Sequence, residues 1–356
     1  MRYTAIFTGG GSAGHVTPNL ALMRSLREEG YSIHYIGTAD GIERTLLQHE
    51  TDIPYHAIHA GKLRRYFSLQ NVADVFRTLK GIGEARKIVR EIKPDVVFSK
   101  GGFVAVPVVI GARKKAPIVI HESDYTPGLS NRIASRFADT VCVTFEDTLA
   151  HTRGKGVCTG TPIRTELYAG DAGRGRAMTG FSADKPVLLM MGGSLGAQAV
   201  NDALRQALPR LLKTFQIVHL CGKGKLDEAS AQPGYVQYEY IGKELPDLMA
   251  MADIVLSRAG ANAAFEFLAL KKPALFIPLP RSASRGDQIV NAAYFAKKGY
   301  AAVLEQEAMT PDTLSGALET LYRDRARYIA AMETEQHADG TQAVLKEIRR
   351  AAEKKR

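Results

Sequence analysis

Residues 5–22 read AIFTGGGSAGHVTPNLAL, and residues 187–204, about half the chain further on, read VLLMMGGSLGAQAVNDAL. Both stretches consist of an apolar run of strand length, a glycine-rich turn and an amphipathic run typical of a helix. A strand, a tight glycine turn and a helix form the opening unit of a Rossmann-like, doubly wound parallel sheet. The repeat therefore predicts two such α/β domains, each beginning with its own glycine turn.

Short apolar runs alternate with helical patterns in both halves, as expected for parallel sheets with crossover helices. We predict strands at residues 3–7, 32–37, 95–99, 117–121 and 140–144, and again at 187–191, 216–220, 253–257 and 274–278. We place an N-terminal domain at 1–162, a C-terminal domain at 163–340 and a basic C-terminal helix at 341–356. Residues 159–186, rich in Gly, Thr and charge, are expected to form the linker.

The composition narrows the class of function. The chain of 356 residues has 47 Lys and Arg against 37 Asp and Glu, which gives a net charge of +10. This balance favours an anionic partner, either a phosphorylated substrate, an acidic lipid surface or nucleic acid. Because the sequence has no recognisable nucleic-acid-binding module, we expect no nucleic-acid partner.

The sequence also indicates where the protein works. Its 3 cysteines are scattered, which favours a reducing compartment and no cysteine-rich metal site. The first residues lack the pattern of a signal peptide, and the longest apolar run, residues 103–112, is too short to span a bilayer. We therefore expect a protein of the cytosol or of a membrane surface.

The first glycine turn matches G-x-G-x-x-G through Gly9, Gly11 and Gly14, the fingerprint of NAD sites. An NAD site also needs an acidic residue where the second strand ends, but that strand ends in Gly37 and Thr38. No G-K-[ST] follows the glycines, which excludes a P-loop. The turn is therefore better suited to another ligand with phosphate or sugar groups than to NAD.

Titratable residues follow several predicted strands. His15 comes where the first turn becomes a helix; it either caps that helix or faces a ligand, where its pKa suits proton transfer near neutral pH. His121, Glu122 and Asp124 follow another strand, and Lys100 follows a third. Because the carboxyl ends of parallel strands meet at one edge, we expect these residues to line one cleft. Taken singly, each is also compatible with an ordinary polar loop.

The second half offers candidates for binding an anion. Ser194 lies in the second glycine turn, and Arg164 at the domain junction can reach a phosphate. Glu266 is the only charged residue between Ala259 and Leu270. Its carboxylate must meet either a basic side chain or the hydroxyl groups of a ligand, because burying it alone is costly. No D-x-D sequence follows a strand, so we expect no metal ion.

Seven motifs follow one another along the chain: TGGGSAGHVTPNLAL, SKGGFVAVP, IHESDYTPGLSN, GTPIR, GGSLGA, SRAGANAAFEFL and GDQIVNA. In this order and spacing they resemble the MurG-type N-acetylglucosaminyltransferases of peptidoglycan synthesis over nearly the whole chain. The resemblance implies a GT-B fold, two Rossmann-like domains facing a cleft, with the acceptor on the N-terminal and the donor on the C-terminal side. It implies inverting transfer of GlcNAc from UDP-GlcNAc to the 4-hydroxyl of MurNAc in lipid I, giving lipid II. This reaction needs no cofactor and takes place at the cytoplasmic face of the cell membrane.

The resemblance also assigns roles to residues. It makes His15 the candidate general base and Glu122 a carboxylate that shares or assists that role. Four positions differ from the pattern of many members: Ser123 and Asp124 replace Gln and Asn, Thr161 replaces Asn, and Leu195 replaces a polar or basic residue. The substrate-binding residues that it implies are Ser12, Ala13, Gly14, Asp124, Arg164, Ser194, Ile241, Ala261, Asn262, Ala263, Ala264, Phe265, Glu266 and Gln288.

Two other functions remain open from the sequence. One is another GT-B lipid glycosyltransferase, such as a diacylglycerol glucosyltransferase; the other is a regulator that binds a nucleotide sugar and would not need His15 and Glu122. Residues 62–93 hold nine basic and three acidic residues among interleaved apolar ones. This segment is either a core helix with a solvated basic face or a surface that docks on an anionic membrane, the partner that we expect.

Overall fold

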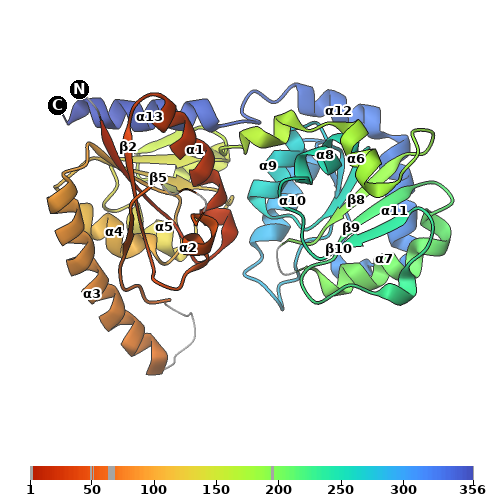
Figure 1. Ribbon diagram of the computed structural model, residues 1–356, viewed down its shortest axis with the longest axis horizontal. Helices are drawn as coiled ribbons and strands as arrows, with labels where there is room; N and C mark the ends of the chain where they lie inside the picture. Colours follow the sequence, from red (N-terminus) through yellow and green to blue (C-terminus); the bar gives the residue numbers. More distant parts are fainter. Residues whose placement is uncertain (1–2, 49, 51, 63–68, 194–195, 356) are drawn as a thin grey trace. The chain divides into compact units, whose positions relative to one another are not determined.

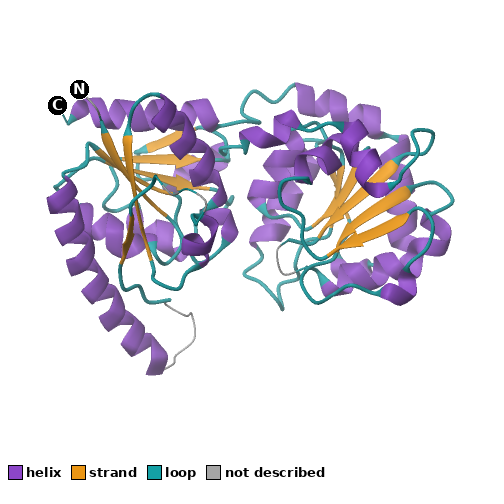
Figure 2. Cartoon of the chain, viewed as in Figure 1, coloured by secondary structure: helices purple, strands orange, loops and turns teal. Residues whose placement is uncertain are grey.

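The computed structural model describes residues 3–48, 50, 52–62, 69–193 and 196–355. It divides into two compact units, unit 1 (Met1–Arg164 with Asp339–Arg356) and unit 2 (Thr165–Ala338) (Figure 1). In each unit, helices flank a sheet in which every pair of neighbouring strands is parallel (Figure 2). The predicted class, two doubly wound α/β domains, is confirmed.

Unit 1 contains a 7-stranded sheet in the order β3-β2-β1-β4-β5-β6-β7. The strand order reverses between β1 and β4, which is the switch point where ligands bind in such sheets. The strands are β1 (Thr4–Thr8), β2 (Ser32–Gly37), β3 (Tyr55–Ala57), β4 (Val96–Ser99), β5 (Ile118–Glu122), β6 (Thr140–Val143) and β7 (Gly156–Cys158). The helices are η1 (Ala13–His15), α1 (Thr17–Glu28), α2 (Ile42–Leu46), α3 (Leu69–Ile92), α4 (Ala105–Ala112), α5 (Leu129–Ala134), η2 (Glu146–His151) and α13 (Thr341–Lys354).

Unit 2 repeats this plan with a 6-stranded sheet in the order β10-β9-β8-β11-β12-β13, reversing between β8 and β11. The strands are β8 (Val187–Met191), β9 (Gln216–Leu220), β10 (Tyr235–Tyr238), β11 (Ile254–Ser257), β12 (Ala274–Phe276) and β13 (Ala301–Val303). The helices are η3 (Thr165–Ala169), α6 (Ala172–Thr179), α7 (Gln198–Leu211), η4 (Glu228–Ser230), α8 (Leu245–Met251), α9 (Ala261–Ala269), α10 (Asp287–Lys297), η5 (Gln306–Ala308), α11 (Pro311–Arg323) and α12 (Arg325–Glu333).

The nine predicted strands are present, and the four that the sequence analysis missed are β3, β7, β10 and β13. All four lie at the edges of their sheets. An edge strand has one neighbour and is only partly covered, so it lacks the continuous apolar run that marks a central strand of a parallel sheet.

The C-terminal helix α13 is not a separate element, as the sequence analysis had placed it, but part of unit 1 (Figure 1). Its buried face, which includes Val344, Leu345 and Ile348, joins the core formed by α1 and one face of the sheet. Thr341 Oγ1 also accepts a hydrogen bond from Ile163 N (3.0 Å). Burial of this apolar face holds the helix on unit 1, although Lys346, Arg350 and Lys354 on its exposed side are basic.

The predicted linker at 159–186 is wrong beyond Arg164, because the residues that follow belong to unit 2. They form η3 and α6, and the side chain of Asp171 caps α6 by accepting from Arg174 N (2.7 Å). Arg174 in turn donates to Asp247 of α8 (2.7 Å). A helix cap and an ion pair stabilise this segment. Its Gly-rich sequence has little apolar periodicity, so the helices could not be recognised from the sequence.

Candidate active site

The first glycine turn follows β1 and presents His15. Gly11 has φ +81°, and a Cβ on Gly9 would lie 2.4 Å from the His15 carbonyl oxygen, so both positions require glycine. Ser12 Oγ lies 2.8 Å from His15 Nδ1. The imidazole is half-buried in η1, just before α1 begins. The turn therefore holds a titratable side chain at the carboxyl edge of the sheet.

A buried glutamate that the sequence analysis missed stabilises this turn. Glu43 is fully buried in α2, and its carboxylate accepts hydrogen bonds from Gly11 N (3.3 Å) and from Thr38 N (2.9 Å) and Oγ1 (2.6 Å). It therefore occupies a turn amide that a phosphate would otherwise use. This contact, together with the missing acid at the end of β2, argues against a dinucleotide in unit 1.

A second glycine turn lies against the first. Gly10 N donates to Gly101 O (3.4 Å), and a Cβ on Gly102 would lie 2.0 Å from Gly10 O and 3.2 Å from His15 Nδ1. The turn at Gly101 and Gly102 follows β4, the neighbour of β1 in the sheet. The structure thus brings together His15 and the end of β4, as the sequence suggested.

Glu122 ends β5 and is 5% exposed. Its carboxylate accepts from Asp124 N (2.9 Å), Gly128 N (3.0 Å) and Asn131 Nδ2 (3.0 Å). Burial, followed by the charge of Asp124, raises the pKa of Glu122 to about 7, although these three hydrogen bonds oppose the rise. Because both carboxylate oxygens are engaged in holding the loop after β5, His15 is the better candidate for a general base.

In unit 2 the corresponding turn follows β8, and its predicted Ser194 lies outside the described residues. Gly193 and Gly196 have φ of +82° and +68°. A Cβ on Gly196 would lie 2.1 Å from Cys221 O, so the turn packs on the loop that follows β9. Asn201 of α7 donates to the same carbonyl oxygen (2.8 Å). The neutral amide of Asn201 therefore holds α7 to the loop after β9, on which the turn packs.

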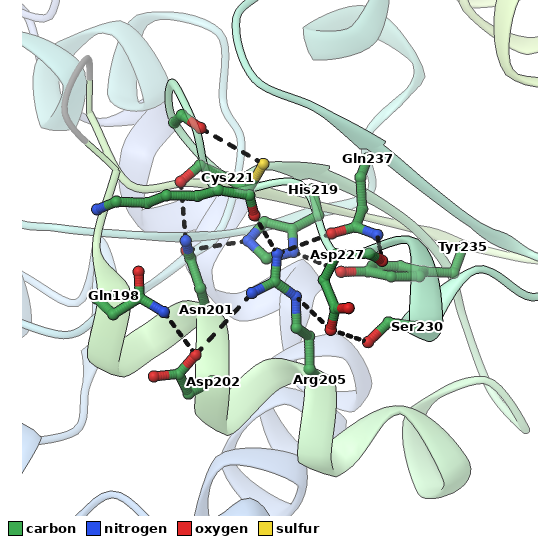
Figure 3. A network of polar contacts seen from close by, with 12 residues as sticks. Gln198, Asn201, Asp202, Arg205, His219, Cys221, Asp227, Ser230, Tyr235 and Gln237 are labelled. Carbon is green, nitrogen blue, oxygen red and sulfur yellow. Dashed lines mark hydrogen bonds and ion pairs between the residues drawn. The ribbon is translucent and has the colours of Figure 1, made fainter.

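Figure 3 shows the polar network around this contact. His219 Nε2 lies 3.0 Å from Asn201 Oδ1, and its Nδ1 lies 2.7 Å from Tyr235 Oη. Burial, helped by the charge of Arg205, lowers the pKa of His219 to about 3, so the imidazole is neutral at physiological pH. Arg205 donates to Gln237 Oε1 (2.8 Å). The network fixes α7 against β9 and β10 beneath the turn.

Two helix starts in unit 2 are suited to an anion. No side chain caps α7 or α9 through a hydrogen bond among the described residues, and the first turn of neither helix holds an acidic residue. Amide groups at a helix N-terminus attract negative charge. The α9 start carries the predicted residues 261–266, of which Glu266 is buried and Phe265 packs edge-on against Phe295 (5.2 Å between ring centroids).

The remaining predicted residues fall at loops and helix starts. Ile241 lies in the loop after β10 and is half-buried. Gln288 lies in the first turn of α10, where its Oε1 accepts from Leu279 N (3.0 Å). Arg164 is the last residue of unit 1 before the chain enters unit 2. The site residues thus form two sets, one in each unit.

Within the described residues, no group of three or more His, Cys, Asp or Glu side chains could hold a metal ion. None of the helices in that part of the chain is both long and apolar enough to cross a membrane.

Two family models match the chain: the N-terminal domain of glycosyltransferase family 28 over residues 5–143, and the C-terminal domain over residues 187–348. The chain belongs to glycosyltransferase family 28. Among curated relatives, the UDP-N-acetylglucosamine--N-acetylmuramyl-(pentapeptide) pyrophosphoryl-undecaprenol N-acetylglucosamine transferase of Lachnospira eligens is 53% identical over 97% of this chain and 98% of its own length. The protein of that name from Clostridium perfringens is 51% identical over 99% of both chains.

Solved structures agree with this family. The crystal structure of Acinetobacter baumannii MurG has a TM-score of 0.76 and 29% identity, covering 98% of this chain and 100% of that one. These similarities confirm the resemblance that the motifs suggested. A UDP-GlcNAc 2-epimerase from Neisseria meningitidis (TM-score 0.67, 14% identity, 99% of this chain and 100% of that one) shares the fold alone. The architecture by itself therefore does not distinguish glycosyl transfer from epimerisation.

Proposed function

We propose that this protein is an inverting glycosyltransferase that moves GlcNAc from UDP-GlcNAc to the 4-hydroxyl of MurNAc in lipid I, giving lipid II. The observation that carries the proposal is the 53% identity, over 97% of the chain, to a relative named for this activity. The two sets of site residues support it, because one can handle a proton and the other can bind a nucleotide diphosphate.

In this proposal unit 2 binds the donor. Glu266 accepts hydrogen bonds from the ribose hydroxyls, and residues 261–265 with Ile241 surround the uridine. Ser194, Arg164 and the N-termini of α7 and α9 stabilise the negative charge that develops on the departing UDP. Gln288 contacts the sugar through its amide group.

Unit 1 binds the acceptor, and His15 removes the proton of the attacking hydroxyl. If Nδ1–H is donated to Ser12 Oγ, the lone pair of Nε2 becomes the basic site. The residues Ser12, Ala13, Gly14 and Asp124 border the donor sugar. Inversion requires attack on the face of the sugar opposite the diphosphate, and the base must lie within hydrogen-bond reach of the attacking hydroxyl.

The proposal also places unit 1 on the cytoplasmic face of the cell membrane. Val72, Val75, Phe76 and Leu79 of α3 are exposed on one side of the helix, Phe76 by 67%. Exposed Arg77 and Lys80 lie beside them. Further along α3, Ala85 and Val89 are buried in the core. In this proposal one half of the helix therefore packs in the core and the other half docks on the membrane. An apolar patch with neighbouring cations suits an anionic lipid surface.

The activity is tested by incubating the full chain with UDP-GlcNAc and a short-chain lipid I analogue. We expect UDP release and a product heavier by one GlcNAc only when the analogue is present, with a β-linkage by NMR that reports inversion. Equal turnover with diacylglycerol as acceptor, or epimerisation of the free donor, would instead overturn the proposal.

Membrane docking is tested by flotation with vesicles that contain anionic phospholipid. Binding should weaken as salt rises and should fall in Phe76→Ser, whereas Leu226→Ser, at an exposed apolar residue of unit 2, should leave it unchanged. Salt-insensitive binding, or equal binding of both variants, contradicts docking through α3.

A further inference from the structure

Lys100 lies directly after β4 and is 1% exposed. Its Nζ lies 2.7 Å from His121 Nδ1, 2.6 Å from Ser123 Oγ and 3.2 Å from Thr161 Oγ1. An ammonium group has three N–H donors and no acceptor, so three acceptors match it in number. Because burying a charge is costly unless its hydrogen bonds are satisfied, this arrangement indicates a site built for a cation.

The protonation of His121 fixes which atom donates in its contact with Lys100. His121 Nε2 lies 2.9 Å from Gly160 O, and a carbonyl oxygen can only accept, so Nε2 carries the proton. Nδ1 then holds a lone pair, and Lys100 must be the donor. Burial, with the charge of Lys100, keeps the pKa of His121 well below its ordinary value, which keeps the ring neutral.

The partners of Lys100 come from separate parts of unit 1. His121 lies in β5, Ser123 begins the loop after it, and Thr161 lies beyond β7. The main-chain N of Lys100 donates to Thr8 O at the end of β1 (3.0 Å). The buried side chain of Lys100 therefore joins the ends of strands that carry residues proposed to bind the sugar acceptor.

Two of these partners flank Glu122, whose carboxylate holds the loop after β5 through three N–H donors. Those bonds favour the ionised carboxylate, whereas its burial favours the neutral acid. Burial lowers the pKa of Lys100 to about 7, although Glu122, Asp124 and Cys142 oppose this shift. Burial also raises the pKa of the Cys142 thiol, so near neutral pH the thiol adds no charge beside Lys100.

We propose that Lys100 is a positioning residue of the acceptor half-site: its side chain joins the ends of β4, β5 and β7, and its positive charge favours the ionised form of Glu122. The carboxylate of Glu122 thereby keeps the hydrogen bonds that it accepts from Asp124 N and Gly128 N of the loop and from Asn131 Nδ2. The sequence agrees with this role, since Ser123 and Thr161 are two of the positions that depart from the family pattern and both accept from Lys100. The inference depends on the proposed function only in calling this half-site the acceptor site.

The test is a titration of Glu122 in the full chain, with glutamate labelled with ¹³C at the side-chain carboxyl. The Glu122 signal is assigned by its loss in Glu122→Gln. Removing a nearby positive charge favours the neutral acid, so in Lys100→Met the apparent pKa of Glu122 should rise by roughly one unit or more. The matched control is Lys272→Met in unit 2, where a largely buried lysine donates to Ala250 O (3.0 Å) and Ala252 O (2.8 Å). The control should lower the melting temperature and leave the Glu122 titration in place.

If Lys100→Met folds and the apparent pKa of Glu122 equals the wild-type value, the inference is overturned. If Lys100→Met does not fold, Thr161→Val removes one acceptor at nearly constant shape; it should raise the pKa of Glu122 by a smaller amount, and no rise overturns the inference. The titration uses no substrate, so it decides the role of Lys100 even if the protein transfers a different sugar.

Discussion

The two glycine turns begin from one sequence pattern but rest on different chemistry. In unit 1 the buried carboxylate of Glu43 accepts from Gly11 N (3.3 Å). In unit 2 the amide of Asn201 donates to Cys221 O (2.8 Å), on which Gly196 packs. A buried charge therefore stabilises the first turn, and a neutral side chain stabilises the second.

This difference shows how one local motif serves two purposes. A carboxylate at a turn amide competes with a phosphate for the same hydrogen bond and repels its charge, so the first turn is unsuited to a diphosphate. Around it, Lys100 and Glu122 add further buried titratable groups. Unit 1 is thus suited to moving a proton, whereas the helix N-termini of unit 2 are suited to holding an anion.

The largest test of this division is His15→Ala. Removing a general base costs on the order of 10²–10⁴ in rate, so kcat should fall by that factor. In the proposed function UDP binds to unit 2, so its affinity, measured by calorimetry, should stay at the wild-type value. Wild-type kcat in His15→Ala together with an inactive, folded Glu122→Gln would move the base to Glu122 and leave His15 with a role in the turn.

A smaller effect is expected from Glu266→Ala. A hydrogen bond to a charged group contributes about 1.5–3 kcal/mol, so UDP binding should weaken by roughly 10–100-fold. The matched control is Glu319→Ala on α11 of the same unit, where the carboxylate pairs with Arg210 at 2.7 Å; this variant should bind UDP normally. Unchanged UDP affinity in folded Glu266→Ala would remove the ribose contact from the proposal.

The sequence predicted the central strands, both glycine turns and the family, because these depend on local patterns and ordered motifs. It missed Glu43, which lies in a five-residue helix whose sequence shows no sign of the turn that it contacts. It named Lys100 only as a strand-end residue, since its three partners are separated from it by 21 to 61 positions along the chain. Contacts of this kind follow from the packing of the sheet, and no spacing in the sequence reveals them.

The sequence also placed Glu122 beside His15 as a possible base without revealing what its carboxylate binds. The hydrogen bonds from Asp124 N and Gly128 N depend on how the loop after β5 folds back on the strand. The apolar flanks of Glu266 correctly indicated that it is buried. The pattern of residue types thus predicts which side chains are buried, whereas their hydrogen-bond partners can be identified only from the folded structure.

The smallest expected effect is on stability, and it has opposite signs in the two units. The pKa of Glu122 rises from 4.5 to about 7 on folding, so its contribution is present at low pH and is lost as the pH rises through 7. The pKa of His219 falls from 6.5 to about 3 on folding. Below pH 6.5 the unfolded chain takes up a proton that the buried ring does not, so stability in unit 2 is lost as the pH falls.

Acidification from pH 6.5 to 4.5 should therefore weaken unit 2 through His219 while it favours unit 1 through Glu122. In His219→Gln, which keeps a donor and an acceptor but cannot titrate, the melting temperature should fall less steeply over this range. About 1 kcal/mol corresponds to a few °C for a chain of this size class, which differential scanning calorimetry resolves. His337→Gln, at an exposed histidine of unit 2, controls for the loss of a histidine and should follow the wild type. Identical slopes in wild type and His219→Gln would mean that the network beneath the second turn tolerates a charged imidazole, and the contrast between the two turns would then no longer hold.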